Sequence, residues 1–218
     1  MKLPGFCDMP IPGGKMSSES KAFLLLRTHN RPNEFNRCIE SISKQSLLPE
    51  IIIISDDEDD TYINEVTLPH QVFRPKYRKP RWWIRHHNPF NDYFNQALEL
   101  IPDGHFVYYL DDDDELVDPD WIKTILEKNT DVLIGRFQLG NSHNNKIIGE
   151  EVMRGKIGGS CIAVRTEIAR AIKWPSKGAG DFFFISRVVE KYKPFFSPII
   201  AGKVQKDLQH SWGVRKSY

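Results

Sequence analysis

The sequence predicts an α/β fold in which a mostly parallel, doubly wound sheet is flanked by helices. Short apolar runs, some rich in β-branched residues, alternate along the chain with longer segments whose apolar residues recur at helical spacing. This alternation is typical of parallel sheets whose strands are joined by helices. The chain has 218 residues, enough for one well-packed domain and too few for two large ones. We therefore expect a single domain.

The first predicted unit is a strand, a helix and a second strand. Residues 23–26 form a short apolar run, and apolar residues at helical spacing follow from Phe35 to Ile42. The run 51–54 consists of isoleucine alone, which suits a strand that is buried on both faces. These three segments predict a β-α-β unit.

A helix and a strand follow, and a further helix begins after them. Residues 94–101 carry apolar side chains at helical spacing, a turn at Pro102 interrupts them, and residues 105–110 form the next apolar run. Asp118 and Pro119 have the residue types of an N-cap and a first-turn proline, so we expect them to begin a helix.

The second half of the chain is less regular. Residues 132–134 and 162–164 are expected to be strands. Thr166 is expected to cap a short helix, and residues 183–192 to form another. Residues 1–20 are rich in Pro, Gly and Ser and predict an irregular N-terminal arm that precedes a domain formed by residues 21–218.

Composition argues against several classes of protein. The 30 Lys and Arg residues balance the 29 Asp and Glu residues, and a net charge of +1 gives no field to attract nucleic acid or an acidic membrane. Cys7, Cys38 and Cys161 fit neither a disulfide framework nor a zinc site, so we expect buried thiols. No segment resembles a signal peptide or a membrane span. We expect a soluble, cytoplasmic protein with no transmembrane segment, and a viral or a bacterial origin is compatible with this composition.

Polar side chains follow three of the predicted strands. They occupy residues 27–31, 56–57 and 111–114, and the last set is four consecutive aspartates. In a parallel sheet these positions meet at the edge where ligands bind. Carboxylates packed together repel each other unless a cation or protons compensate them. Oxygen ligands favour Mg²⁺ or Mn²⁺, and Mg²⁺-like ions commonly share their coordination between carboxylates and phosphates. The pattern predicts a divalent cation and a nucleotide diphosphate, although a plain acidic turn before a helix is the alternative.

Several segments resemble family 2 glycosyltransferases with the GT-A fold. YYLDDDDELVDPDWI resembles the Asp-x-Asp segment of that family, in which an apolar strand enters the motif and a helix leaves it. FLLLRTHNRP resembles the opening strand and loop, IIIISDDEDD the second strand with its base- or ribose-binding acid, and NQALELIPDGHF the helix before the motif. GGSCIAVRTEIARAIKWPSKGAGDFFFISRVVEK resembles the acceptor-side loop and the segment with the catalytic base. The likeness spans roughly residues 22–191.

The resemblance implies a nucleotide-binding half at about residues 21–117, an acceptor half at about 118–218, and the following site residues. Donor-binding positions are Thr28, Asn30, Arg31, Asp56, Asn95, Asp111 and Asp112, with Asp111 as the first motif acid. Asp113 would bind the metal, with His210 in the C-terminal tail as a further ligand that would favour Mn²⁺ over Mg²⁺. Gly158, Gly159 and Ser160 would form the acceptor or sugar loop, and Asp181 would be the catalytic base.

One position departs from the family pattern, because Gly180 stands where a glutamate is usual. Asp181 could also be a simple helix N-cap. A separate segment, residues 74–87, interleaves basic and aromatic residues and leaves three interpretations open. It could be a platform for single-stranded nucleic acid, a contact for the pyrophosphate of the donor, or a solvated loop with a tryptophan in the core.

The function that the resemblance implies is a metal-dependent, inverting transfer of a sugar from a nucleotide diphosphate donor, with UDP as the expected nucleotide. The acceptor would be a hydroxyl on a glycan, or on a lipid-linked or protein-linked conjugate. A nucleotidyltransferase on a related fold is the first alternative, but the loop RTHNRP lacks the glycines of a triphosphate-binding loop. A non-catalytic module that binds a cation or a carbohydrate is the second.

Overall fold

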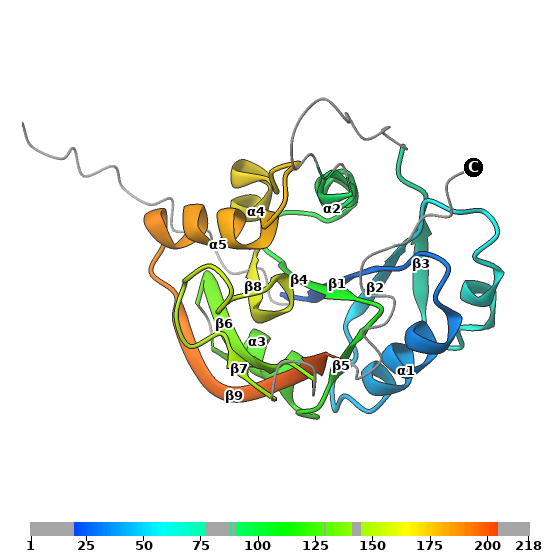
Figure 1. Cartoon of the computed structure of the whole chain (residues 1–218), viewed down its shortest axis with the longest axis horizontal. Helices are drawn as coiled ribbons and strands as arrows, with labels where there is room; N and C mark the ends of the chain where they lie inside the picture. The colour runs from blue at the N-terminus through cyan, green and yellow to red at the C-terminus, as the bar shows by residue number, and fades with distance from the viewer. Residues whose placement is uncertain (1–19, 77–87, 89, 129, 141–144, 205–218) are drawn as a thin grey trace, which may run out of the picture.

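The computed structural model describes residues 20–76, 88, 90–128, 130–140 and 145–204 (Figure 1). The strands are β1 (Ala22–Arg27), β2 (Glu50–Ile54), β3 (His70–Phe73), β4 (Phe106–Asp111), β5 (Asp114–Leu116), β6 (Val132–Gln138), β7 (Ile147–Ile148), β8 (Ile162–Arg165) and β9 (Phe195–Val204). The helices are α1 (Pro32–Ser43), α2 (Asn91–Ala97), α3 (Trp121–Glu127), α4 (Thr166–Ile172) and α5 (Gly180–Lys191), with short 3₁₀ turns at Thr61–Glu65, Leu98–Leu100 and Gly159–Cys161.

The strands form a single curled sheet in the order β3-β2-β1-β4-β8-β6-β9-β5, and β7 pairs with β6. The first four strands of this order are parallel. Beyond β4 the sheet is mixed, since β8 runs antiparallel to both of its neighbours while β6 and β9 are parallel. Helices α2, α4 and α5 lie on one side of the sheet and α1 and α3 on the other (Figure 1). The predicted α/β fold class is confirmed.

The centre of the sheet is the core of the molecule. Leu24, Leu25 and Leu26 of β1 are fully buried, and the isoleucines of β2 and the apolar residues of β4 are buried beside them. Strands covered on both faces need apolar residues without alternation, which is the pattern that these three runs have. In the register of the sheet, Arg27 lies beside Ile54 on one side and Asp111 on the other. The polar residues that follow the three strands therefore emerge at one edge.

The predicted helices are present, but two of their beginnings differ from expectation. Asp118 is not the N-cap of α3, because its carboxylate accepts a hydrogen bond from the Asp120 N–H (2.9 Å) in the turn before the helix. Thr166 is the first residue of α4 and not its cap, and its hydroxyl donates to the carbonyl of His105 (3.1 Å). Both side chains fasten neighbouring backbone and leave the helix ends uncapped.

The sequence pattern misses β3, β5, β7 and β9. Strand β9 contains Pro198 and Gly202, which are residues that argue against a central strand. The structure accommodates Pro198 where the pairing of β6 with β9 loses its regular register. A Cβ at Gly202 would overlap the ring of Phe137, so this glycine allows β9 to pass close to β6.

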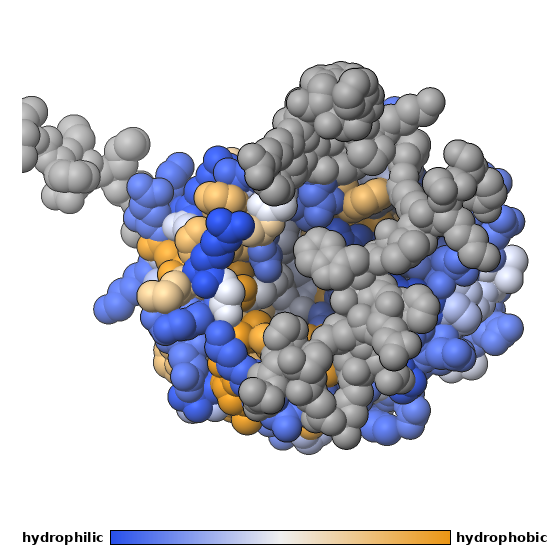
Figure 2. Space-filling view, viewed as in Figure 1, coloured by the Kyte–Doolittle hydropathy of each residue, from blue (hydrophilic) through white to orange (hydrophobic). Residues whose placement is uncertain are grey.

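Apolar residues of β9 also remain exposed, among them Phe195, Phe196 and Ile200. Figure 2 shows hydrophobic surface on the side of the molecule where β6 and β9 lie, whereas the side of α1 is mainly hydrophilic. Strand β9 has apolar residues on its exposed face as well, so it lacks the alternation of apolar and polar residues by which half-buried strands are recognised in sequences.

Cys38 and Cys161 are free and buried, as predicted. Cys7 and the rest of the predicted arm up to residue 19 lie outside the described residues, as does His210. Within the described part of the chain, no helix has the length and apolar character that crossing a lipid bilayer requires.

Candidate active site

The acidic turn formed by Asp111, Asp112, Asp113 and Asp114 connects β4 to β5 at the edge of the sheet predicted to bind ligands. Asp111 is the last residue of β4 and Asp114 the first of β5, so the two middle aspartates form the turn itself. The loop between β1 and α1 lies beside this turn, because β1 is the parallel neighbour of β4.

Arg27, at the end of β1, holds Asp111 with both ends of its guanidinium. Its Nε donates to Asp111 Oδ1 (2.9 Å) and its Nη2 to Oδ2 (3.0 Å). The guanidinium also lies over the ring of Phe94, 4.8 Å from the ring centroid. A two-pronged arginine–carboxylate pair fixes the orientation of the carboxylate as well as its charge. The sequence pattern assigns no role to Arg27, because only the sheet register reveals its partner.

Arg31 makes ion pairs with two residues of the same turn. Its guanidinium contacts the carboxylate of Asp112 and lies 3.3 Å from that of Asp113. The Asp112 side chain is 0% exposed, whereas the Asp113 side chain is 20% exposed. Of the two acids that pair with Arg31, Asp113 is therefore in contact with solvent and Asp112 is buried.

Asp112 and Thr28, which are both expected to contact the donor, are hydrogen-bonded to each other, and their contact with a donor stays a prediction. The Thr28 hydroxyl donates to Asp112 Oδ2 (2.8 Å), and the same hydroxyl lies 2.8 Å from the hydroxyl of Tyr62. Thr28 is 2% exposed and the His29 N–H also points to Asp112 (3.4 Å). Both side chains are enclosed by the protein, and Asp112 anchors the loop between β1 and α1.

Burial and the charges of neighbouring aspartates raise the pKa values of three of the four carboxyl groups in this turn. Burial raises the pKa of Asp112 to about 7 although Arg31 and Thr28 favour its charged form. Burial, followed by the charge of Asp111, raises the pKa of Asp113. Burial raises that of Asp114 well above its usual range, with the charges of Asp113 and Asp111 adding to the effect. The Ser160 hydroxyl donates to Asp114, which lies inside the fold.

The oxygen donors of this turn fit a hard divalent cation, but they do not complete its coordination. Asp111 and Asp113 are its partly exposed acids, and carboxylate oxygens are ligands that Mg²⁺ and Mn²⁺ accept. In the described ranges no group of three or more His, Cys, Asp or Glu side chains is placed to hold a metal ion. Further ligands would come from water, from bound phosphates or from His210, which lies outside these ranges.

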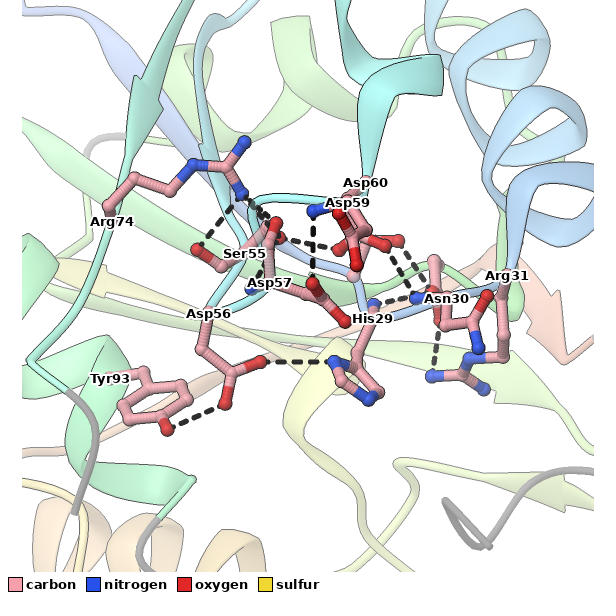
Figure 3. Close-up of polar contacts among 12 residues, drawn as sticks. His29, Asn30, Arg31, Ser55, Asp56, Asp57, Asp59, Asp60, Arg74 and Tyr93 are labelled. Carbon is pink, nitrogen blue, oxygen red and sulfur yellow. Dashed lines mark hydrogen bonds and ion pairs between the residues drawn. The ribbon is translucent and has the colours of Figure 1, made fainter. Parts of the chain in front are cut away.

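Asp56 follows β2 and has a partner at each of its carboxylate oxygens (Figure 3). The Tyr93 hydroxyl donates to Oδ2 (2.8 Å), and Nδ1 of His29 lies 3.1 Å from Oδ1. The hydrogen bond to Asp56 raises the pKa of His29. The Asp56 side chain is 8% exposed and that of His29 is 42% exposed. A ligand at this position would meet His29 together with Asp56.

Asn30 is exposed and has a left-handed backbone (φ 51°). Asparagine adopts this conformation more readily than most residues. Its N–H donates to Asp60 Oδ1 (2.8 Å), while Asp60 Oδ2 accepts from the Ser55 hydroxyl (2.5 Å), as Figure 3 shows. Arg74 joins the same network by donating to the Ser55 hydroxyl (2.6 Å). The loops after β1 and β2 are thus tied to each other.

A pocket of about 190 Å³ opens next to the acidic turn. Its lining includes Arg27 and Asp111 from the parallel strands, Gly159 and Ser160 from the predicted sugar loop, Trp174, and Asp181 from α5. The structure therefore brings the first motif acid, the predicted loop and the predicted base to one cavity, although these residues are far apart in the sequence.

Asp181 lies in the first turn of α5, and the N-cap position belongs to Ala179. Its Oδ1 accepts a hydrogen bond from the Phe182 N–H (2.8 Å), and burial raises its pKa. Asp181 is therefore not the N-cap of α5, because it lies two residues after the cap position. Gly158 leaves open space beside the carboxylate, since a Cβ there would lie 4.0 Å from Asp181 Oδ2.

Asn95 holds backbone in this structure, and its contact with a donor stays a prediction. Its amide donates to the carbonyl of Trp174 (2.9 Å) and accepts from the Trp174 N–H (2.8 Å). Asn91, one turn earlier on α2, donates to the carbonyls of Pro175 and Lys177 (3.0 Å each). The two asparagines clamp the loop that leads into α5.

The same clamp gives a reason for Gly180. A Cβ at Gly180 would overlap the amide nitrogen of Asn91, so the side chain of Asn91 occupies the space that a larger residue would need. The departure from the family pattern at this position is matched by a residue on another helix. Most of residues 74–87, including every arginine and tryptophan after Arg74, lie outside the described residues, so their three interpretations stay open.

No family model and no curated protein matches the sequence. Solved structures do match the fold. S. aureus TarS superposes with a TM-score of 0.60 at 17% identity, over 85% of this chain and 60% of that one. A mannosyltransferase from Pyrobaculum calidifontis, in complex with GDP-Man and Mn²⁺, superposes with a TM-score of 0.61 at 16% identity, over 89% of this chain and 60% of that one.

The chain has a GT-A type fold. Glucosyl-3-phosphoglycerate synthase from Mycobacterium tuberculosis, in complex with Mn²⁺, UDP and glucosyl-3-phosphoglycerate, also superposes, with a TM-score of 0.61 at 9% identity over 91% of this chain and 78% of that one. A CMP:2-keto-3-deoxy-manno-octonic acid synthetase complexed with CTP also matches, with a TM-score of 0.52 at 10% identity over 84% of this chain and 91% of that one. Nucleotidyltransferases therefore share this fold. The TarS structure described above comprises residues 1–349, and the match covers 60% of it and 60% of the mannosyltransferase chain. Of a longer TarS chain the match covers 38%.

Proposed function

We propose that this chain is a metal-dependent glycosyltransferase that moves a sugar from a nucleotide diphosphate to a hydroxyl acceptor. The observation that carries the proposal is the shared pocket of Asp111 and Asp181 beside the acidic turn. Such a pocket offers an acid at the phosphate side and a second acid across the cavity. Sugar transfer from a nucleotide diphosphate needs these two positions, one for the donor and one for the acceptor proton.

Asp181 would act as the general base. Burial raises its pKa, and a carboxylate with a raised pKa removes a hydroxyl proton more effectively than an ordinary aspartate. Deprotonation of the acceptor at the moment of attack would give a single displacement with inversion at the anomeric carbon. Gly158 would let the sugar approach the backbone closely, whereas at Gly159 the ring of Trp174 lies where a side chain would be.

Asp113 would hold the divalent cation, and the bound ion would neutralise charge on the departing diphosphate. Arg27 would keep Asp111 oriented beside it. Asp56, which follows β2, and His29, which follows β1, would face the nucleoside. UDP is the nucleotide that we propose first, and GDP is the other donor to test.

A nucleotidyltransferase is the second candidate because solved structures of that class share the fold. The loop after β1 argues against it. Nucleotide triphosphates are usually cradled by the free backbone N–H groups of a glycine-rich loop. Here the N–H groups of His29 and Asn30 already point to the carboxylates of Asp112 and Asp60.

Calorimetric titration tests the proposal directly. The full chain is titrated with UDP, GDP and their sugars, with and without Mn²⁺. We expect metal-dependent binding that Asp113→Ala abolishes, whereas Asp131→Ala, which removes an exposed acid on the lead into β6, leaves it unchanged. Equal binding by wild type and Asp113→Ala would remove Asp113 from the metal site and contradict the proposal. Tight binding of CTP or UTP in place of the sugar nucleotides would favour the nucleotidyltransferase.

A further inference from the structure

The guanidinium of Arg31 lies beside Asp113, the residue proposed to hold the divalent cation. Its guanidinium reaches the exposed acid of the turn (3.3 Å) and the fully buried acid next to it. A guanidinium and a metal ion that share one carboxylate repel each other, because like charges a few ångströms apart interact unfavourably even in a polar protein environment. Arg31 and the ion therefore cannot both make their best contact with Asp113.

The backbone around Arg31 is held on both sides. The preceding residue, Asn30, is tied to Asp60 through its N–H, and the following residue, Pro32, begins α1. The Arg31 N–H itself points to the hydroxyl of Tyr62 (3.5 Å). With the backbone fixed, the guanidinium can leave Asp113 only by a change of side-chain rotamer.

Asp112 gives Arg31 a second anchor that does not depend on Asp113. Asp112 is fully buried, and a buried carboxylate that loses its counter-ion is strongly destabilised. The contact with Asp113 is different, since both side chains there are partly exposed and the distance is longer. The weaker of the two ion pairs is the one at the predicted metal ligand.

We infer that Arg31 is the resident counter-ion of Asp113 and competes with the divalent cation for it. The inference rests on the proposed role of Asp113 as a metal ligand. When the ion binds, Arg31 gives up Asp113 and keeps Asp112. The affinity of the nucleotide-free protein for Mn²⁺ is consequently lower than the acidic turn alone would provide.

Electron paramagnetic resonance of free Mn²⁺ measures this affinity without any turnover. The full chain is titrated as wild type, Arg31→Met and Arg31→Lys, each in the absence of nucleotide. We expect Arg31→Met to bind Mn²⁺ roughly tenfold more tightly than wild type, which corresponds to a modest charge repulsion of about 1.4 kcal/mol. Arg31→Lys keeps the positive charge and should stay close to wild type. Equal or weaker binding by Arg31→Met would overturn the inference.

A second pair of variants covers the case in which Arg31→Met does not fold. Asp112→Asn removes the buried charge that needs Arg31, and Asp112→Asn/Arg31→Met then removes the guanidinium as well. We expect the double variant to bind Mn²⁺ more tightly than Asp112→Asn alone, and equal affinities would overturn the inference. If no variant and no wild-type protein binds Mn²⁺, even with UDP or GDP present, the proposed metal dependence itself fails. If the proteins with and without the Arg31 guanidinium bind Mn²⁺ equally tightly, the competition is ruled out and the proposed function is unaffected.

Discussion

Charged side chains at the edge of the sheet are compensated within the protein. Arg27 pairs with Asp111, Arg31 with Asp112 and Asp113, and His29 with Asp56. The three basic side chains come from the end of β1 and the loop after it, and their acidic partners come from the turn that begins at the end of β4 and from the loop after β2. The free energy of unfolding and the transfer rate should therefore change with pH as individual groups ionise.

The pair of His29 and Asp56 predicts a pH dependence of stability. The hydrogen bond to Asp56 raises the folded-state pKa of His29 above the unfolded value near 6.5. A raised histidine pKa stabilises the folded state fully below the unfolded pKa, and this stabilisation is lost as the pH rises through the folded pKa. The free energy of unfolding of wild type should thus fall over this interval, relative to His29→Gln.

Urea unfolding at a series of pH values measures the difference. His70→Gln serves as the control, because the ring of His70 is hydrogen-bonded to the carbonyl of Leu68 (2.8 Å) and not to a carboxylate. Its profile should run parallel to that of wild type. The same parallel profile for His29→Gln would contradict the assignment of the charged pair.

Asp181→Asn separates binding from transfer. The amide keeps the size of the side chain but cannot take up a proton, so the donor should bind as before while transfer falls by at least about a hundredfold. Because burial raises the pKa of Asp181, the transfer rate of wild type should increase with pH through a value above the usual range of an aspartate. Calorimetry with the donor and a radiochemical transfer assay give the two readouts. Transfer that survives in Asp181→Asn would place the base elsewhere.

Helix α2 positions the start of α5 through its two asparagines. Asn91 and Asn95 hold the loop at residues 174–177, and this loop leads to Ala179, whose φ of 54° is unusual for a residue with a side chain. Such a conformation persists when the surroundings hold it in place. The clamp thereby sets the direction in which Asp181 enters the pocket.

A double-mutant cycle tests the contact between α2 and α5. Gly180→Ala should lower the free energy of unfolding by roughly 2 kcal/mol, because its Cβ would overlap the Asn91 amide in a packed site. In an Asn91→Ala background the same change should cost less, with a coupling energy of about 1 kcal/mol. Chemical denaturation of the four proteins provides the numbers.

Gly158→Ala is the matched control for this cycle. The nearest atom to a Cβ there is Ile148 Cδ1 at 3.4 Å, and the backbone is extended, so the substitution should change stability little. Additive effects of Gly180→Ala and Asn91→Ala would show that the two positions do not share space.

The sheet runs without interruption through both predicted halves of the molecule. Strand β4 of the first half pairs with β8 of the second, and β5 pairs with β9, which is the last strand of the described residues. The acidic turn lies between β4 and β5, so its geometry depends on strands from both ends of the sequence. A division at about residue 117 is a functional hypothesis and would not be a boundary between separately folding units.

A single cooperative transition is therefore expected on unfolding. Tryptophan fluorescence and far-UV circular dichroism should give the same midpoint in urea, because no part of the sheet can be removed without exposing its neighbour. Two separated transitions would contradict a single domain and would favour independent halves.

The sequence is sufficient to predict the strands β1, β2 and β4, the helices between them and the edge at which polar residues gather. These features depend on local order, because burial on both faces requires continuous apolar runs and parallel strands bring their ends together. The resemblance to GT-A glycosyltransferases implies the roles of Asp111, the loop at residues 158–160 and Asp181. Asp111, Gly159, Ser160 and Asp181 line one pocket, while their chemical roles stay predictions.

Other features depend on partners that are distant in the sequence. Arg27 and Asp111 are 84 positions apart, as are Thr28 and Asp112, and Asn95 reaches Trp174 across 79. Local spacing carries no information on such pairs, so it misses the partner of Arg27 and the hydrogen bonds that Thr28, Asp112 and Asn95 make within the protein. Strand β9 is missed for a related reason, since Pro198 and Gly202 are tolerated only because of the irregular pairing and the close packing against β6. Folding decides which polar groups are satisfied inside the protein, and so which ones remain to meet a substrate.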